Sequence, residues 1–298
     1  MTATAETTTA APPATGTPGR FSKWPVYLVV VVIAALWTIP SLGLLVNSFR
    51  EPGSIRAEGW WTVFPLKIFD TAAWTLDNYS RVLDEGFGNA FANTLAVSIP
   101  SVVIPITIAA FAAYAFAWMS FPGRNTLFVI VVGLMVVPLQ MALIPILRVY
   151  TRFDLVGTYP AVWLAHAGFG LPLAVYLLRN YMGSLPSSII ESANIDGADH
   201  FSIFSRLIVP LSVPVLASFA IFQFLWVWND YLVALIFLGP EPSRRVLTVE
   251  LADLAGRGEG ALNLLPAAAF VTMILPMVVF FALQRFFVRG LTAGSVKG

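Results

Sequence analysis

The chain has 298 residues, of which 58% are hydrophobic and only 11% are charged. Soluble domains carry about 25% charged residues, so this chain lacks the polar surface that a water-soluble globule of its size needs. It has no cysteine, which excludes disulfide frameworks, zinc–thiolate sites and iron–sulfur clusters. A net charge of +1 gives no reason to expect nucleic acid as a partner. The composition indicates a protein that crosses a membrane several times.

The first 24 residues are rich in Thr, Ala and Pro and are predicted to form a disordered tail. The remainder, 25–298, is predicted to be one transmembrane domain, because six of its stretches reach the ~20 apolar residues that span a bilayer. The stretches are Pro25–Val46, Phe91–Met119, Thr126–Ile146, Tyr159–Leu178, Leu211–Leu238 and Ala261–Leu283. Their internal prolines are tolerated where neighbouring helices satisfy the freed carbonyls. The expected fold is therefore all-α with six transmembrane helices.

The orientation of these helices does not follow from the charges. An even number of spans places both termini on one side of the membrane. The loops on that side carry eight Lys and Arg, and the loops on the other side carry nine. Because the excess of basic residues marks the cytoplasmic side, this balance leaves the orientation open.

The connection between the fourth and fifth stretches is predicted to contain two short helices. Ser188 and Glu191 have the spacing of a capping box, which starts a helix that Gly197 ends. Asp199 is predicted to cap a second helix that stops before Pro210. Two short amphipathic helices have little core of their own. They either bind a partner or lie on lipid headgroups, and physical reasoning leaves both possibilities open.

The same connection, residues 179–210, resembles the EAA signature loop of binding-protein-dependent ABC importers. That signature reads Glu-Ala-Ala, Gly and then Ile-x-Leu-Pro at fixed spacing. The matching positions are Glu191, Ser192, Ala193, Gly197, Leu207, Val209 and Pro210. Residues 196–198 resemble the sugar branch of this family, whose loops read Ile-Asp-Gly-Ala. The C-terminal residues 284–298 are similar to the end of the second permease subunit of maltose-type sugar importers. Several other runs, such as 169–172 and 222–228, are most similar to the α-glucoside branch.

This resemblance implies a permease that imports a carbohydrate, an α-glucoside or a related oligosaccharide, across the bacterial cytoplasmic membrane by alternating access. It implies that both termini and residues 179–210 are cytoplasmic. The implied partners are a companion permease in a heterodimer, two ATP-binding cassette subunits, an extracytoplasmic sugar-binding protein and membrane lipid. The chain has no G-x-x-x-x-G-K-[ST] loop, so it is expected to bind no cofactor, and the partner subunits would hydrolyse ATP.

The resemblance also implies which residues contact the ATPase. They are Glu191, Ala193, Asp196, Gly197, Ala198, Phe204 and Pro210. Glu191 would pair with a basic residue of the ATPase, and Gly197 would form the tight turn between the two short helices. No catalytic residue and no metal site are expected, because neither histidine has a second ligand at metal spacing.

Asp230 lies in the fifth stretch beside Trp228 and Asn229. An ionised Asp at the bilayer centre costs ~2.5–3.5 kcal/mol, so it is expected to face a cavity or a partner helix. Three roles remain open. Asp230 could bind a sugar hydroxyl together with Asn229, in which case Trp228 would also line the translocation pathway. It could instead form structural hydrogen bonds to the backbone or to another subunit. It could also relay protons in a proton-coupled secondary carrier, which is the alternative function. A membrane-embedded enzyme would need clustered carboxylates or histidines near an interface.

Overall fold

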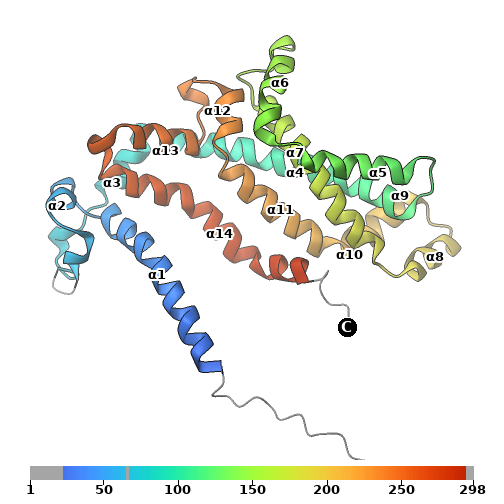
Figure 1. The fold of residues 1–298 in the computed structure, drawn as a ribbon, viewed down its shortest axis with the longest axis horizontal. Coiled ribbons are helices and arrows are strands. Elements are labelled where there is room, and N and C mark those ends of the chain that lie inside the picture. The colour runs from blue at the N-terminus through green and yellow to red at the C-terminus, as the bar shows by residue number, and fades with distance from the viewer. Residues whose placement is uncertain (1–22, 65–66, 293–298) are drawn as a thin grey trace, which may run out of the picture.

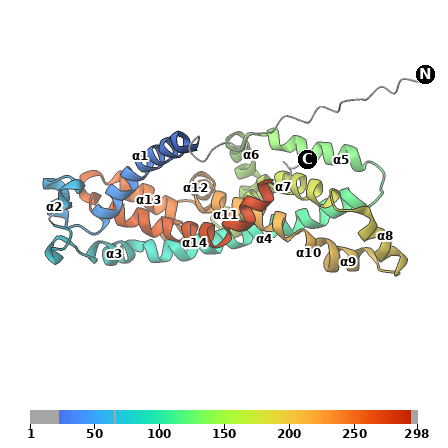
Figure 2. The same ribbon diagram turned by 90° about the horizontal axis from the view of Figure 1, so that it is seen from below.

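A computed structural model describes residues 23–64 and 67–292, with side chains up to residue 284. All regular structure in these residues is helical, which confirms the predicted all-α fold. The first 22 residues of the predicted tail lie outside the described part of the chain. The long helices run between two ends of an elongated molecule (Figures 1 and 2). One end carries α2 (Pro52–Ala57), α3 (Asp77–Val82) and α13 (Leu247–Gly256), and the other carries α8 (Ser187–Ile195), α9 (His200–Ile203) and α10 (Val209–Leu211).

Four helices are long and apolar enough to cross a bilayer, and the described residues contain six spans if each of two bent pairs counts as one. The four are α1 (Trp24–Ser48), α4 (Gly88–Trp118), α7 (Tyr159–Gly183) and α14 (Leu264–Thr292). They match the first, second, fourth and sixth predicted stretches. Prolines lie inside all four of them, as expected where neighbours satisfy the freed carbonyls.

The third predicted stretch is broken. It consists of α5 (Arg124–Gly133), a short 3₁₀ turn at Leu134–Val136, and α6 (Leu139–Arg152), with a bend of 103° between its halves. Val137 and Pro138 are both extended, with ψ of 115° and 126°. Proline lacks the N–H of an intrahelical bond and disfavours the helical conformation in the residue before it. The prediction of one helix over this stretch was wrong at this proline.

The fifth predicted stretch is broken as well. α11 (Val213–Trp228) ends before Asn229, and α12 (Leu232–Leu238) continues after the break. A second bend, of 71°, separates α11 from the helical segment that ends at Leu211. The prediction of one continuous helix was wrong at Asp230. Asp favours helix starts over helix interiors, and here its carboxylate accepts the N–H groups of Val233 and Ala234 in the first turn of α12.

The helices pack around α4, which lies along α7 and also contacts α11. α11 and α1 both pack against α14. Only the last part of α1 is buried, at Gly43, Val46 and Ser48. Most of the apolar surface of α1 is thus open to lipid or to another subunit.

Candidate functional site

The first short helix of the 179–210 connection, α8, begins at Ser187. Its N-cap is Pro186, and no side chain caps it. The predicted capping box of Ser188 and Glu191 was wrong because the N-cap lies two residues before Ser188. Ser188 is therefore a residue of the first helical turn, where its side chain is no longer at the N-cap position.

Gly197 ends α8, as predicted. Its φ of +80° lies in the left-handed region, which favours glycine. The Ala198 N–H donates to the Ala193 carbonyl, and the Gly197 N–H donates to the Asn194 carbonyl, both at 3.0 Å. This pair of bonds is a Schellman motif, which satisfies the last carbonyls of the helix. A Cβ atom added at Gly197 would meet nothing within 4 Å, so the turn faces open space.

Asp199 caps the second short helix, as predicted. Its Oδ1 accepts the Ser202 N–H at 2.6 Å, and this bond holds the pKa of the carboxyl below its usual value. α9 then continues through a wide π turn at Phe204–Ile208 into α10 and ends at Leu211. The prediction that the helix stops before Pro210 was wrong. In a regular α-helix the ring of Pro210 would clash with the carbonyl four residues earlier. The wider π turn before it alters this geometry, so the helix continues past the proline.

The two helices divide the predicted coupling residues into exposed and buried groups. Glu191, Asp196, Gly197 and Pro210 are exposed, Ala198 is half-buried, and Ala193 and Phe204 are buried. Two large apolar side chains are also exposed, Ile195 by 86% and Phe201 by 67%. We call Glu191, Ile195, Asp196 and Phe201 the α8–α9 face. It combines two carboxylates with two apolar side chains, and the sequence did not single out Ile195 as part of it.

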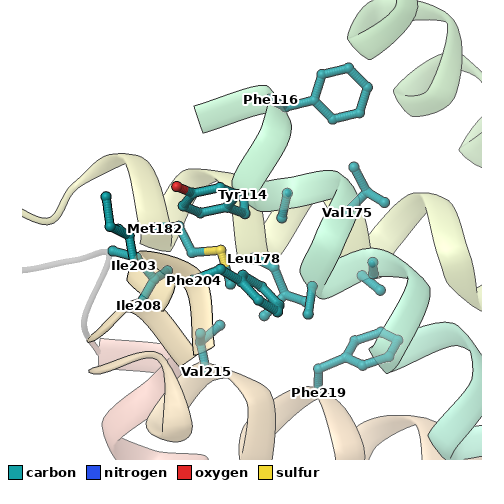
Figure 3. Packing of buried hydrophobic residues seen from close by; sticks show 14 of the residues in the cluster. Tyr114, Phe116, Val175, Leu178, Met182, Ile203, Phe204, Ile208, Val215 and Phe219 are labelled. Atoms are coloured by element: carbon teal, nitrogen blue, oxygen red, sulfur yellow. The ribbon is translucent and has the colours of Figure 1, made fainter. Parts of the chain in front are cut away.

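The buried side of α9 is fixed to α4 (Figure 3). Phe204 stacks on Phe111 with ring centroids 4.6 Å apart and meets Tyr114 edge-on at 5.4 Å. The Tyr114 hydroxyl lies 3.0 Å from Nδ1 of His200. Aromatic pairs of this kind contribute about 0.5–1.5 kcal/mol each beyond their buried area. Displacement of α9 would therefore move the end of α4 with it.

α7 and α11 complete this attachment. Ile203, Ile208 and Met182 are almost fully buried in one cluster with side chains of α4, α7 and α11. The Tyr181 hydroxyl at the end of α7 donates to the Leu211 carbonyl at 3.1 Å. The α8–α9 face is therefore carried by a segment that packs on three membrane helices at once.

Asp230 has partners in three elements. Its two carboxylate oxygens accept the N–H groups of Val233 and Ala234 at 3.3 and 3.0 Å, and so cap α12. Oδ2 also lies 3.6 Å from Nε2 of His166, a fully buried side chain of α7. The Thr248 hydroxyl of α13 donates to the Asp230 carbonyl at 2.5 Å. Of the three roles left open by the sequence, bonding to backbone is the one with direct contacts.

The two neighbours of Asp230 differ in exposure. Trp228 is fully buried, and its Nε1 donates to the Thr272 carbonyl at 3.0 Å. Asn229 is exposed, and its Nδ2 donates to the Leu225 carbonyl at 2.7 Å. In this conformation Asn229 is open to a solute, whereas Trp228 is not. Among the described residues, no three His, Cys, Asp or Glu side chains are grouped so that they could hold a metal ion.

Three comparisons relate this arrangement to known proteins. The chain is 55% identical to the osmoprotective compounds uptake permease GgtD of Synechocystis sp., over 93% of each protein. It is 43% identical to the alpha-glucoside transport system permease AglG of Rhizobium meliloti, over 92% of this chain and 97% of that protein. Its fold is similar to a chain of a bacterial alginate ABC transporter crystallised with an alginate pentasaccharide-bound periplasmic protein. The TM-score is 0.63 at 15% identity, over 89% of this chain and 94% of that chain.

The family model for the "binding-protein-dependent transport system inner membrane component" matches residues 90–293, more than half of the chain. This match covers the 179–210 connection, so the resemblance stated for that segment is confirmed. The relatives are transport permeases, which also confirms the prediction of a transporter rather than an enzyme. The chain belongs to the family of inner-membrane components of binding-protein-dependent transport systems.

Proposed function

We propose that this chain is a permease subunit of an ATP-driven importer that moves a carbohydrate, an α-glucoside or a related oligosaccharide. The α-glucoside permease AglG supports the substrate class, because it is similar over nearly the whole chain. The observation that carries the coupling role is the α8–α9 face, which is exposed on one side and anchored to three membrane helices on the other.

The partner of the α8–α9 face is an ATP-binding cassette subunit. The face has the small size and mixed chemistry of a helix that binds in a groove. Within the described part of the chain, Glu191 has no ion pair or hydrogen bond to its side chain, so its charge is available to a basic residue. A desolvated contact of this kind contributes ~1.5–3 kcal/mol. ATP is bound and hydrolysed by two such subunits, and this chain needs no cofactor of its own.

The movement that opens the pathway follows from the packing. When the ATPase subunits close, the α8–α9 segment moves, and the ends of α4, α7 and α11 follow because their side chains are interlocked with it. The helix bundle then switches between an inward-facing and an outward-facing state, and ATP bound to the partner subunits shifts the balance between them. A companion permease forms the other half of the pathway, and an extracytoplasmic sugar-binding protein delivers the solute.

The orientation and location belong to the same proposal. The α8–α9 face and both termini lie in the cytoplasm, and the chain sits in the bacterial cytoplasmic membrane with lipid around its apolar helices. Segments 47–90 and 239–260 then lie outside the cell. The two ends of the molecule in Figure 1 are consistent with this arrangement, because α13 lies at the end opposite to α8.

A proton-coupled carrier that relays protons through Asp230 is the competing function. Both oxygens of that side chain already accept backbone N–H groups, so each transport cycle would have to break the cap of α12. The test is uptake of radiolabelled sucrose, trehalose and maltose into vesicles that hold the whole complex and its binding protein. Our proposal predicts uptake that requires ATP and the binding protein and survives an uncoupler. Uptake that collapses with the proton gradient, or needs no ATP, would contradict it.

A further inference from the structure

A pocket is lined by residues at α12 and α13. Figure 1 shows these two helices away from α8 and α9, with α12 toward the middle of the molecule. Its volume of ≈ 500 Å³ is within the 300–1,000 Å³ of small-molecule sites. Its lining includes Tyr231, Arg245, Asp253 and Arg257. We call it the α12–α13 pocket. Its concave shape suits a small solute better than the flat surface of a docked protein.

The charged side chains of the pocket are held in place by one another. Asp253 Oδ2 lies 3.1 Å from Nη2 of Arg257 and 3.8 Å from Nη1 of Arg245. Arg257 also contacts Glu85 at 2.6 Å, and Arg245 contacts Glu250 at 3.5 Å. Planar charged groups fixed in this way offer donors and acceptors at set positions, and Arg in particular has five N–H donors.

The charged side chains of the α12–α13 pocket must face water rather than lipid. The side chains of Asp253 and Arg257 are 46% and 49% exposed, and such exposure toward hydrocarbon would be costly. Asp253 Oδ1 accepts no hydrogen bond within the described part of the chain. A hydroxyl group that enters the pocket can therefore donate to Asp253 and accept from either arginine.

Tyr231 adds an aromatic surface. Its side chain is 42% exposed at the pocket. An aromatic ring gives the apolar C–H face of a sugar a large contact area at low cost in conformational entropy. The combination of one ring with fixed charged donors and acceptors suits a polyhydroxylated solute, which has both an apolar face and many hydroxyl groups.

The pocket also lies at the break in the fifth span. Tyr231 directly follows Asp230, which caps α12, and Thr248 of α13 is hydrogen-bonded to the Asp230 carbonyl. Broken helices recur at solute sites in membrane transporters, because irregular backbone is tolerated in a membrane only where it is covered by protein or lines an aqueous cavity. A solute in this pocket would thus contact the element that interrupts the span.

We propose that the α12–α13 pocket is a subsite for a carbohydrate at the entrance of the pathway, where Tyr231 stacks on the sugar and Asp253, Arg245 and Arg257 bind its hydroxyl groups. This inference rests on the proposed function, since it names a site for the carbohydrate that the complex imports. It gives the chain direct contact with solute, in addition to its coupling role.

The experiment uses the intact complex in proteoliposomes with its binding protein loaded with sucrose, trehalose or maltose. Two quantities are measured: sugar imported per ATP hydrolysed, and the binding-protein concentration that half-saturates ATP hydrolysis. The variants are Tyr231→Ala, Tyr231→Phe, which keeps the ring, and Asp253→Asn, which keeps the shape. Asp84→Asn is the matched control, an exposed acid outside the pocket.

We expect Tyr231→Ala and Asp253→Asn to lower the sugar imported per ATP about threefold to tenfold, as expected for loss of one stacking or hydrogen-bonding contact. Tyr231→Phe should import more sugar per ATP than Tyr231→Ala because it keeps the ring, Asp84→Asn should match the wild type, and half-saturation should not change in any variant. An unchanged import ratio in Asp253→Asn would overturn the inference even if Tyr231→Ala failed to assemble.

Two further outcomes have distinct meanings. A change in half-saturation at an unchanged import ratio would also overturn the inference, because it would assign the pocket to docking of the binding protein. Failure of the wild-type complex to import any of the three sugars with ATP would refute the proposed function itself, and the subsite with it.

Discussion

Substitutions at Gly197 can distinguish two effects: strain in the turn between α8 and α9, and contact of that turn with a partner protein. A non-glycine L-residue in the left-handed region costs about 1–2 kcal/mol, and Asn and Asp tolerate it better than Ala. A Cβ atom at this position meets nothing within 4 Å. The chain itself therefore opposes a substitution only through backbone strain, and any larger effect must come from what docks there.

This reasoning sets the order of effects in a series at position 197. Backbone strain alone would make Gly197→Ala the worst variant, with a penalty of about 1–2 kcal/mol, or a factor of about 5 to 30 in the population of the turn. Contact with an ATPase makes side-chain size and charge decisive instead. We therefore expect Gly197→Ala to reduce uptake moderately, Gly197→Asn to reduce it more than tenfold, and Gly197→Asp to abolish it.

The assay measures ATP-dependent uptake in vesicles together with co-purification of the ATPase. Membrane insertion of each variant is checked by protein yield in the membrane fraction, which should equal that of the wild type because the turn faces open space. Normal transport and normal co-purification of Gly197→Asp would refute the docking assignment. A Gly197→Asn variant as active as the wild type beside an inactive Gly197→Ala would show that strain alone matters.

Three further predictions concern single contacts. Asp230→Asn should lower uptake less than tenfold at normal expression, because an amide oxygen still caps α12; a complete loss would indicate a relay or solute role. Trp228→Phe should cost about 0.5–1.5 kcal/mol in thermal unfolding of the purified complex, since the hydrogen bond to Thr272 is lost; no change would contradict this contact. The Asp199 cap should be fully present above pH ~4 and weaken as pH falls through its lowered pKa, whereas Asp199→Asn should show no such change. Amide exchange at Ser202, compared between wild type and variant, measures this difference.

The sequence predicted where the chain crosses the membrane, but not where the spans break. Apolar length depends on local composition alone, so the four long helices and the first bent pair were found, whereas the second bent pair begins at His200, before the predicted fifth stretch. A proline in an apolar run is compatible with a kinked helix or with a break. Pro105 remains inside α4 because that helix is packed along α7, whereas Pro138 separates two halves with a bend of 103°. Tertiary packing decides between these outcomes.

For the 179–210 connection, the sequence likewise predicted some local features but not the packing between helices. The Gly197 turn and the Asp199 cap depend on a few neighbouring residues, and both were correct. Phe201 and Phe204 look alike in the sequence, yet one is 67% exposed and the other 7%. Their difference depends on where α4 passes, which no local pattern contains. The contact of Asp230 with His166 was missed for the same reason, although the expense of a charge in an apolar stretch indicated that some partner was needed.

The central claim is that the α8–α9 face lies in the cytoplasm and is covered by an ATPase. The chain has no cysteine, so Ile195→Cys places the only thiol of this subunit on that face. A membrane-impermeant maleimide should label this thiol in inside-out vesicles but not in intact cells, and bound ATPase should protect it from the reagent. Labelling from outside the intact cell, or labelling that the ATPase does not reduce, would contradict the account.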